Sequence, residues 1–301
     1  MLSILIPTKD YNCCKLAEAL QQQATAIGLP YEIIVGEDGS SPQGLQMNAS
    51  IMQLPGCRIV RLSHNVGRSK MRNILAEEAK GENIMFIDSD AIVENDTFLI
   101  KYIKALETYN VVCGGLYHAD KLNDKRCTLR YRYEKNADTR RSAAHRSKAP
   151  YDNFTTFCFA IRRDIFIQIK FNEEINRYGY EDTLFGHELR KRDITIKHID
   201  SPLLHNGLEE NAVYLNKIEE SLHTLYNIRK EIGCTPLLRC CNRLKSLYLT
   251  GTVAYLWRIL KAPLRRNLLS NTPSLILLNI YKVGYFCNIV TRQKGERAKQ
   301  H

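Results

Sequence analysis

The chain has 301 residues, of which 44% are hydrophobic and 25% are charged. This composition is that of an ordinary globular protein and excludes an intrinsically disordered chain. The formal net charge of +11 is concentrated in residues 239–301, which contain twelve Lys or Arg and one acid, Glu296. Because residues 1–238 carry 31 basic and 31 acidic side chains, the basic tail predicts a separate role for the C-terminal region, with anionic membrane or nucleic acid as candidate partners.

The ten cysteines predict neither a disulfide framework nor a zinc site. The first residues, Met1 to Pro7, lack the basic region and the cleavage site of a signal peptide. Cys13-Cys14, Cys240-Cys241 and the other scattered thiols do not have Cys-x-x-Cys spacing. We therefore expect reduced, cytosolic thiols and assign them no site.

The first half of the chain alternates short β-branched runs with amphipathic stretches. Strands are predicted at residues 2–6, 32–35, 58–62, 83–87 and 111–116. Helices are predicted between them, at residues 14–26, 44–53, 68–79 and 96–108. This order predicts an α/β fold with a mostly parallel central sheet and helices on both faces.

Residues 121–148 interrupt this pattern. They contain ten Lys or Arg and three acids, which favours a flexible solvated loop or, alternatively, a phosphate-facing lid over a site. Beyond them we predict a strand at 153–162, a short helix at 164–169, a helix ending near 192 and a strand at 194–199.

Asp88 and Asp90 place two carboxylates one residue apart, directly after the strand predicted at 83–87. The carboxyl end of a strand is the usual location of a ligand site in an open α/β sheet. Carboxylate oxygens suit Mg²⁺ or Mn²⁺, and such an ion commonly bridges the protein to nucleotide phosphates. An acidic turn can also be an ordinary solvated loop. The prediction of a metal-bound nucleotide therefore needs the support of the other motifs.

Two polar motifs follow the strands predicted at 32–35 and 58–62. Asp38 can accept hydrogen bonds from a base or a ribose. The amides near Gly67 and the side chain of Arg68 lie at a predicted helix start, which favours an anion, and Arg72 shares a helix face with Arg68. Each motif has a plain alternative, since an Asp-Gly-Ser turn and an Arg pair are common on protein surfaces.

A second acidic motif is Glu181-Asp182, which follows Tyr178-Gly179-Tyr180. Acids in the first turn of a helix complement the positive end of its dipole. An aromatic and glycine setting can also desolvate a carboxylate and raise its pKa toward that of a general base. The two explanations are compatible, because a base also has to be held in place.

Together these motifs resemble family 2 glycosyltransferases with the GT-A fold. The resemblance is carried by Ile4-Leu5-Ile6-Pro7-Thr8, Glu32 to Ser40, Asn65-x-Gly67, Arg72-Asn73, Asp88-Ser89-Asp90 and Glu181-Asp182. It covers residues 1 to about 210 and leaves the tail uncovered. It implies a GT-A catalytic domain at residues 1–210 that inverts the anomeric centre in one displacement, and leaves residues 211–301 as a helical, basic C-terminal region.

The resemblance also implies roles for single residues. Asp182 is the implied catalytic base, with Glu181 as its supporting or acceptor-binding partner. His205 is implied as a metal ligand, although a single histidine can equally be structural. The implied nucleotide-binding residues are Pro7, Thr8, Asp38, Asn65, Gly67, Arg68, Arg72 and Asp88, and the implied ligands of Mn²⁺ or Mg²⁺ are Asp88, Asp90 and His205.

The C-terminal region begins with an amphipathic stretch at residues 209–232. Apolar stretches at 246–257 and 267–281 are shorter than the roughly 20 residues of a membrane-spanning helix. Arg258 and Lys261, interleaved with Tyr255 and Trp257, instead predict a helix lying on an anionic bilayer. The alternative is a helical cap on the flank of the catalytic domain.

We therefore expect an inverting, metal-dependent glycosyltransferase in the cytoplasm, peripheral on the inner face of the cell membrane. It would move a sugar from a nucleotide-sugar donor, first of all a UDP-sugar, to a saccharide or glycolipid acceptor in cell-surface polysaccharide or glycolipid synthesis.

Two alternatives belong to other classes. A sugar nucleotidyltransferase usually carries a Gly-rich basic signature near its first strand, where this chain has Pro7-Thr8-Lys9-Asp10. A non-enzymatic nucleic-acid- or membrane-binding protein would rely on the basic tail, which contains no known nucleic-acid module. We accordingly expect no nucleic-acid partner.

Overall fold

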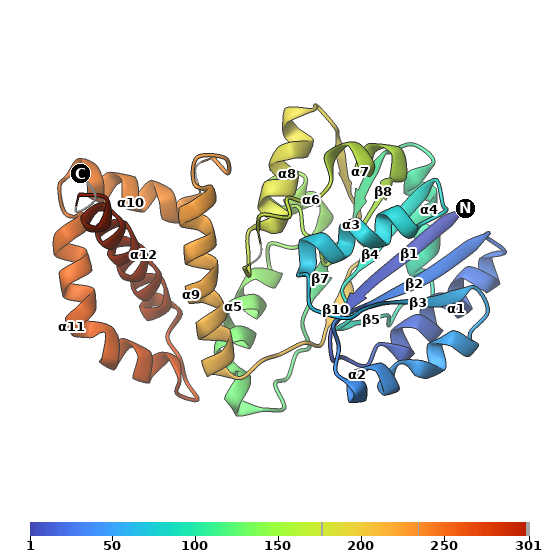
Figure 1. The fold of residues 1–301 in the computed structure, drawn as a ribbon, viewed down its shortest axis with the longest axis horizontal. Coiled ribbons are helices and arrows are strands. Elements are labelled where there is room, and N and C mark those ends of the chain that lie inside the picture. Colours follow the sequence, from blue (N-terminus) through green and yellow to red (C-terminus); the bar gives the residue numbers. More distant parts are fainter. Residues whose placement is uncertain (176, 234, 299–301) are drawn as a thin grey trace. The chain divides into compact units, whose positions relative to one another are not determined.

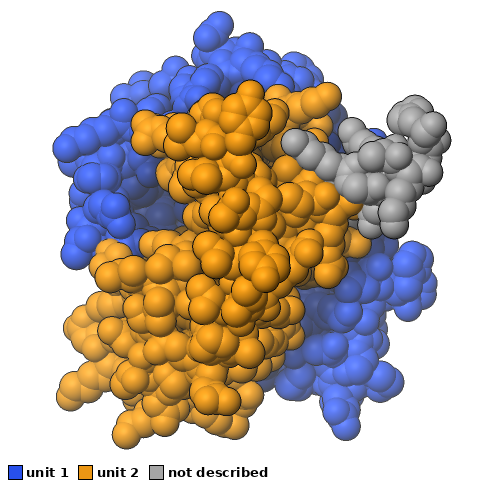
Figure 2. All heavy atoms as spheres, turned by 90° about the vertical axis from the view of Figure 1, so that its left-hand side faces the viewer, with its two compact units in different colours: residues 1–119, 137–176, 181–207 blue, residues 120–136, 177–180, 208–301 orange. Residues whose placement is uncertain are grey.

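The structure is a computed structural model that describes residues 1–175, 177–233 and 235–298. The chain divides into two compact units, coloured separately in Figure 2. Unit 1 comprises residues 1–119, 137–176 and 181–207, and unit 2 comprises residues 120–136, 177–180 and 208–301.

Unit 1 is built on a seven-stranded sheet with the order β3-β2-β1-β4-β8-β6-β9. Its strands are β1 (Leu2–Thr8), β2 (Tyr31–Asp38), β3 (Cys57–Leu62), β4 (Asn83–Ile87), β6 (Val111–Cys113), β8 (Cys158–Arg162) and β9 (Ile196–His198). Only β8 runs antiparallel to its neighbours, and the other pairs are parallel. The predicted α/β fold with a mostly parallel sheet is confirmed.

A second sheet in unit 1 has three short strands in the order β5-β10-β7. They are β5 (Ala91–Ile92), β10 (Leu203–His205) and β7 (Leu116–Tyr117). Strand β10 pairs antiparallel with β5 and parallel with β7. This small sheet brings together three segments that are far apart in the sequence.

Helices cover both faces of the large sheet, as Figure 1 shows. Along β1 the side chains alternate between the faces, because successive residues of a strand point in opposite directions. Ile4 and Ile6 therefore join one core cluster, and Leu5 joins the other. The first cluster is covered by α1 (Cys14–Ile27) and α4 (Phe98–Leu106), and the second by α3 (Arg68–Glu78), α7 (Arg163–Ile169) and α8 (Glu181–Lys191).

The helix predicted at 44–53 is interrupted. The structure has α2 (Pro42–Met47) and a 3-10 helix, η1 (Ala49–Gln53), on either side of Asn48. The buried side chain of Asn48 accepts the amide N–H of Cys13 at 3.0 Å and donates to a carboxylate oxygen of Glu37 at 2.7 Å. These tertiary hydrogen bonds hold Asn48 in a conformation that ends the first helix.

The strand predicted at 111–116 is also divided. Strand β6 ends at Cys113, and the chain resumes in the other sheet as β7 after Gly114 and Gly115. The guanidinium of Arg146 donates to the carbonyl oxygens of Cys113 and Gly114, both at 2.9 Å. Gly115 has a φ of +81°, a backbone conformation that favours glycine.

The flexible loop predicted for residues 121–148 is wrong. This segment contains η2 (Lys125–Cys127), α5 (Thr128–Asp138) and α6 (Ala143–Arg146). Arg146, which the charge pattern placed in solvent, is only 4% exposed. It also donates to Ile199 O at 2.8 Å and to Nδ1 of His198 at 2.6 Å. Burial lowers the pKa of His198 to about 4, so this imidazole is neutral and can accept.

After residue 148, the observed boundaries differ from the predicted ones mainly at the strand predicted at 153–162. Residues 150–153 form a turn, and β8 begins only at Cys158. The strand predicted at 194–199 is shortened to β9.

Unit 2 contains the helices α9 (Asn211–Ile228), α10 (Pro236–Ser246), α11 (Thr250–Leu268) and α12 (Leu275–Ala298). Trp257 of α11 packs edge-on against Tyr281 and Tyr285 of α12, with ring centroids 5.9 and 5.2 Å apart. Gly284 makes this approach possible, because a Cβ there would overlap the indole. Within residues 1–175, 177–233 and 235–298, no helix combines the length and the apolar character needed to cross a bilayer.

Candidate active site

The carboxyl ends of β1, β2 and β4 lie at the same edge of the large sheet, because these strands pair in parallel. The strand order reverses at β1, which lies between β2 and β4. Such a reversal is where open α/β sheets bind ligands. Pro7 and Thr8 close β1, Asp38 closes β2, and Asp88 follows β4. The structure therefore brings these predicted residues to one edge.

Asp38 holds the loop that leads into α3. Its two carboxylate oxygens accept the backbone amides of Val66 at 2.6 Å and Gly67 at 3.0 Å. The side-chain oxygen of Asn65 also accepts from the Gly67 amide, at 2.9 Å. Gly67 has a φ of +90°, so this loop depends on a glycine there. Asp38 and Asn65 thus shape the backbone at the start of α3.

Arg72 and Asp88 form an ion pair at the sheet edge. Nη2 of Arg72 lies 2.6 Å from Oδ1 of Asp88, and the Arg72 side chain is only 1% exposed. Burial raises the pKa of Asp88, while the guanidinium of Arg72 and the charge of Arg68 oppose this rise. Nε and Nη1 of Arg72 are buried and have no hydrogen-bond partner among the described residues. These donors suit an anionic ligand, since unpaired buried donors are costly.

Asp90 and His205 form a second pair, because the pairing of β10 with β5 brings them side by side. His205 pairs with Ala91, the residue after Asp90, and Nε2 of His205 lies 3.1 Å from Oδ2 of Asp90. Gly207 borders this pair, because a Cβ at Gly207 would overlap the Asp90 carboxylate. A carboxylate and an imidazole are a suitable donor set for Mn²⁺ or Mg²⁺, so these residues fit a divalent cation.

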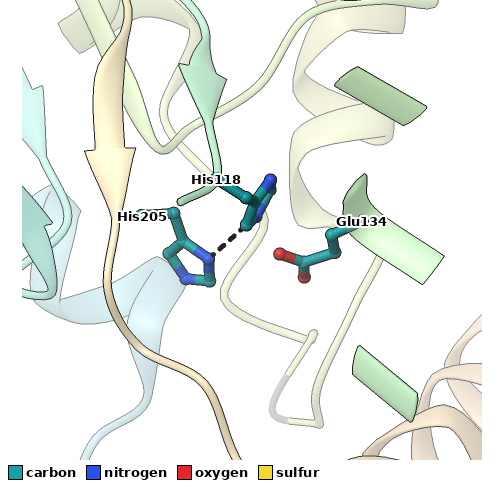
Figure 3. A group of neighbouring side chains, drawn as sticks. All are labelled: His118, Glu134 and His205. Atoms are coloured by element: carbon teal, nitrogen blue, oxygen red, sulfur yellow. Dashed lines mark hydrogen bonds between the residues drawn. The ribbon is translucent and has the colours of Figure 1, made fainter. Parts of the chain in front are cut away.

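His118 is a neighbour of this pair that the sequence motifs do not predict. Figure 3 shows its imidazole hydrogen-bonded to that of His205, with Nε2 of His118 3.2 Å from Nδ1 of His205. Glu134, also drawn there, belongs to unit 2 and pairs with Arg130 at 2.9 Å. No local pattern marks His118, and only the pairing of β7 with β10 places it beside His205.

Asp182 and Glu181 form the first turn of α8. Burial, and to a smaller extent the adjacent charge of Glu181, raises the pKa of Asp182 to about 6. The amide of Thr183, 2.6 Å from Oδ1 of Asp182, and the positive charge of Arg72 act in the opposite direction. A carboxylate with this pKa can accept a proton near neutral pH and release it again.

The family model described as "Glycosyl transferase family 2" matches residues 3–170. The chain is 29% identical over 99 residues to poly(ribitol-phosphate) beta-N-acetylglucosaminyltransferase TarS of Staphylococcus aureus (strain MW2), over 32% of this chain and 17% of TarS. It is 29% identical over 124 residues to glycosyltransferase GlyG of Streptococcus pneumoniae serotype 4, over 40% of each protein. The chain thus matches less than half the length of either relative.

Two solved structures share the fold. Residues 1–349 of S. aureus TarS in complex with UDP-GlcNAc align with a TM-score of 0.50 and 18% identity, over 75% of this chain and 66% of that one. The mannosyltransferase PcManGT from Pyrobaculum calidifontis, in complex with GDP-Man and Mn²⁺, aligns with a TM-score of 0.55 and 13% identity, over 95% of this chain and 84% of that one. At these identities the likeness concerns the fold alone.

The substitution Glu181→Gln tests the electrostatics of Asp182. We expect the pKa of Asp182 to fall below about 6, because a neighbouring negative charge is removed. It should still stay above the ordinary value of an Asp side chain, because burial is the larger cause of the raised pKa. A carboxylate ¹³C NMR titration measures it. Glu188→Gln, on the same helix and paired with Lys191 at 2.7 Å, is the matched control. An unchanged Asp182 pKa in Glu181→Gln would contradict this electrostatic account.

Proposed function

Because the chain belongs to glycosyl transferase family 2 and has the GT-A fold, we propose that this glycosyltransferase inverts the anomeric centre of a nucleotide-sugar donor. One observation carries the proposal. Unit 1 contains all the polar groups that the reaction needs, which are Asp182, the ion pair of Arg72 and Asp88, and the pair of Asp90 and His205. We assign catalysis to residues 1–210.

The donor in this proposal is a UDP-sugar. The TarS structure in complex with UDP-GlcNAc supports that choice. The nucleotide would occupy the edge formed by Pro7, Thr8 and the loop from Asn65 to Gly67, with Asp38 holding the loop. Arg68 and the unpaired donors of Arg72 would face the diphosphate, because a guanidinium matches phosphate geometry.

Asp90 and His205, together with Asp88, would hold Mn²⁺ or Mg²⁺. The PcManGT structure in complex with Mn²⁺ supports a divalent cation. A cation bound there would stabilise the negative charge that develops on the leaving diphosphate.

Asp182 would act as the general base. Its carboxylate would take the proton of the acceptor hydroxyl while that oxygen attacks C1 of the sugar from the face opposite the diphosphate. The bond between C1 and the phosphate oxygen breaks in the same step, so no covalent intermediate with the protein forms. With a pKa of about 6, Asp182 is mostly ionised at pH 7.5 and ready to accept this proton.

The acceptor would be a saccharide or glycolipid used in cell-surface polysaccharide or glycolipid synthesis, and α11 would bring the enzyme to the cytosolic membrane face. Ala254, Trp257, Leu264 and Leu268 form the buried side of α11. Tyr255, Leu256, Ile259 and Leu260 are between 46% and 63% exposed. Because residues 239–295 contain basic side chains and no acid, this apolar face suits an anionic lipid surface.

Release of nucleoside diphosphate from UDP-, GDP- and CMP-sugars is the first test of the proposal. We expect turnover of one UDP-sugar that requires Mn²⁺ or Mg²⁺, is abolished by chelator and is lost in Asp90→Asn. Asp96→Asn, which alters an acid outside the proposed site, should retain activity. Absence of turnover across the panel, together with no nucleotide binding in calorimetry, would refute the proposed function.

Asp182→Asn should reduce transfer by about 10²- to 10⁴-fold, the usual contribution of a general base, while the donor still binds. In the wild type, the rate should fall as the pH drops through about 6, because protonation of Asp182 removes the base. Initial rates between pH 5 and 8 and donor calorimetry measure both effects. Asp164→Asn, which changes an exposed acid paired with Arg162 at 2.9 Å, is the control. Wild-type transfer by Asp182→Asn would mean that another group is the base.

The double variant Leu256→Ser, Ile259→Ser tests the membrane proposal. We expect it to lower partitioning onto vesicles of phosphatidylglycerol and phosphatidylcholine by roughly tenfold or more, because two half-exposed apolar side chains no longer enter the lipid. Co-sedimentation measures the partitioning, with Met52→Ser on unit 1 as an exposed control. If the wild type binds vesicles of phosphatidylcholine alone as strongly as it binds the mixed vesicles, anionic lipid does not contribute to the interaction.

A further inference from the structure

Asn73 belongs to the Arg72-Asn73 motif and ties a distant segment of unit 1 to α3. Its side chain is buried. The side-chain oxygen of Asn73 accepts the backbone amide of Phe171 at 2.9 Å, and the side-chain nitrogen donates to the carbonyl oxygen of Phe171, also at 2.9 Å. The same nitrogen donates to a carboxylate oxygen of Glu173 at 3.0 Å. One planar amide thus binds both backbone groups of Phe171 and fixes this residue against α3.

The ring of Phe171 contacts the two elements that carry Arg72 and Asp182. The guanidinium carbon of Arg72 lies 5.6 Å from the centroid of this ring, a favourable arrangement for a cation and an aromatic face. On α8, the ring of Phe185 stacks on Phe171 with a centroid distance of 4.5 Å. Phe185 comes three residues after Asp182 in α8, so both side chains lie on one face of that helix. Phe171 therefore fixes the guanidinium and the helix of the proposed base at the same time.

Arg72 and Asp182 carry opposite charges but are not hydrogen-bonded to each other. The charge of Arg72 lowers the pKa of Asp182, so the two groups are close enough to interact. Within the part of the chain that the structure describes, both hydrogen bonds to the Asp182 carboxylate come from Thr183, at 2.6 and 3.3 Å. Nε and Nη1 of Arg72 are buried and lack a partner there. Buried donors are normally paired, which indicates that the surrounding contacts hold this guanidinium away from the carboxylate.

An ion pair between these two groups would remove both from their proposed roles. A cation in contact with a carboxylate favours its ionised form and lowers its pKa by about 1 to 3, so Asp182 would become a weaker base. Its oxygens would also be occupied when the acceptor hydroxyl arrives. In the same pair, Arg72 would lose the donors proposed for the diphosphate. The proposed reaction therefore requires that Arg72 and Asp182 stay apart.

We propose that Asn73 and Phe171 are positioning residues that keep the guanidinium of Arg72 apart from the carboxylate of Asp182. Asn73 fixes Phe171, the ring of Phe171 holds one face of the guanidinium, and Asp88 holds Nη2 at 2.6 Å. Arg72 then stays available to the donor diphosphate, and Asp182 to the acceptor hydroxyl. The inference rests on the proposed function and adds two residues to it. All of these residues belong to unit 1.

The pKa of Asp182 in the variants Phe171→Leu and Asn73→Ala tests this role without donor or metal. Glu181 and Arg72 are the neighbouring charges that act on this carboxylate, and neither variant removes them. We expect the pKa of Asp182 to fall from about 6 to about 5 or lower in both variants, because the released guanidinium pairs with it. A carboxylate ¹³C NMR titration measures this pKa, and thermal melts verify that each variant is folded.

Phe166→Leu is the matched control, because it removes another ring of the same aromatic cluster, 5.7 Å from Phe171. It should leave the pKa of Asp182 near 6, since Phe171 and its contact with Arg72 remain. Asp182→Asn identifies the signal. A pKa that stays near 6 or rises in Phe171→Leu would overturn the proposal. An equal fall in Phe166→Leu would also contradict it, because loosening of the cluster would then be the cause.

Binding of UDP and of uridine, each with Mg²⁺, provides a second readout. We expect Phe171→Leu to weaken UDP binding by about tenfold in calorimetry, because Arg72 is drawn to Asp182 and away from the diphosphate. Uridine has no phosphate, so its binding, followed by NMR titration, should stay within about twofold of the wild type. Equal losses for the two ligands would indicate a general defect of the nucleotide edge and contradict the positioning role.

The two measurements separate failure of this inference from failure of the proposed function. If the wild type binds UDP and turns over a donor, but both variants leave the pKa of Asp182 unchanged, the function stands and the positioning role is wrong. If the pKa falls in Phe171→Leu, but the wild type neither binds UDP nor releases nucleoside diphosphate from any nucleotide-sugar, the separation of Arg72 from Asp182 stands and the proposed function is wrong.

Discussion

The parallel pairing of β1 with β2 and β4 is the constraint on which the rest of the catalytic unit depends. Parallel strands end at the same edge of a sheet, so Thr8, Asp38 and Asp88 lie at one edge although they are far apart in the sequence. The same pairing places the first turn of α3 there, because the loop after β3 is held by Asp38. Backbone hydrogen bonds between strands therefore position the polar groups at the edge of the large sheet.

Two buried guanidiniums connect this edge to the remainder of unit 1. Arg72 pairs with Asp88 and influences the pKa of Asp182, so one charge acts on both the nucleotide side and the base side of the proposed site. Arg146 instead binds backbone carbonyls at the point where β6 ends and β7 begins. Loss of Arg72 would leave the Asp88 carboxylate without its partner, and breaking a buried ion pair in this way costs about 3–5 kcal/mol. Loss of Arg146 would leave buried carbonyl oxygens without a donor. Both arginines are therefore sensitive positions for the fold.

In the proposed site, the nucleotide and the cation are bound by residues of two different sheets. The large sheet supplies the edge where a nucleotide would lie. In the small sheet, β10 ends at His205, Asp90 directly precedes β5 and His118 directly follows β7. Gly207 lies two residues after His205, and its lack of a side chain leaves room for the Asp90 carboxylate. A cation bound by Asp90 and His205, as we propose, would be held firmly, because His205 lies in a paired strand and Asp90 directly precedes one.

The α/β class, most strands of the large sheet and the acids that follow them were predictable from the sequence, because alternation along a strand and polar residues at its end are local patterns. The acid pairs at Asp88, Asp90 and at Glu181, Asp182 were visible for the same reason. Three features were not predictable in this way: Asn48 ends a helix, Arg146 is buried and His118 lies against His205. Those outcomes depend on contacts between segments remote in the sequence, and no local pattern of hydrophobic or charged residues encodes such contacts.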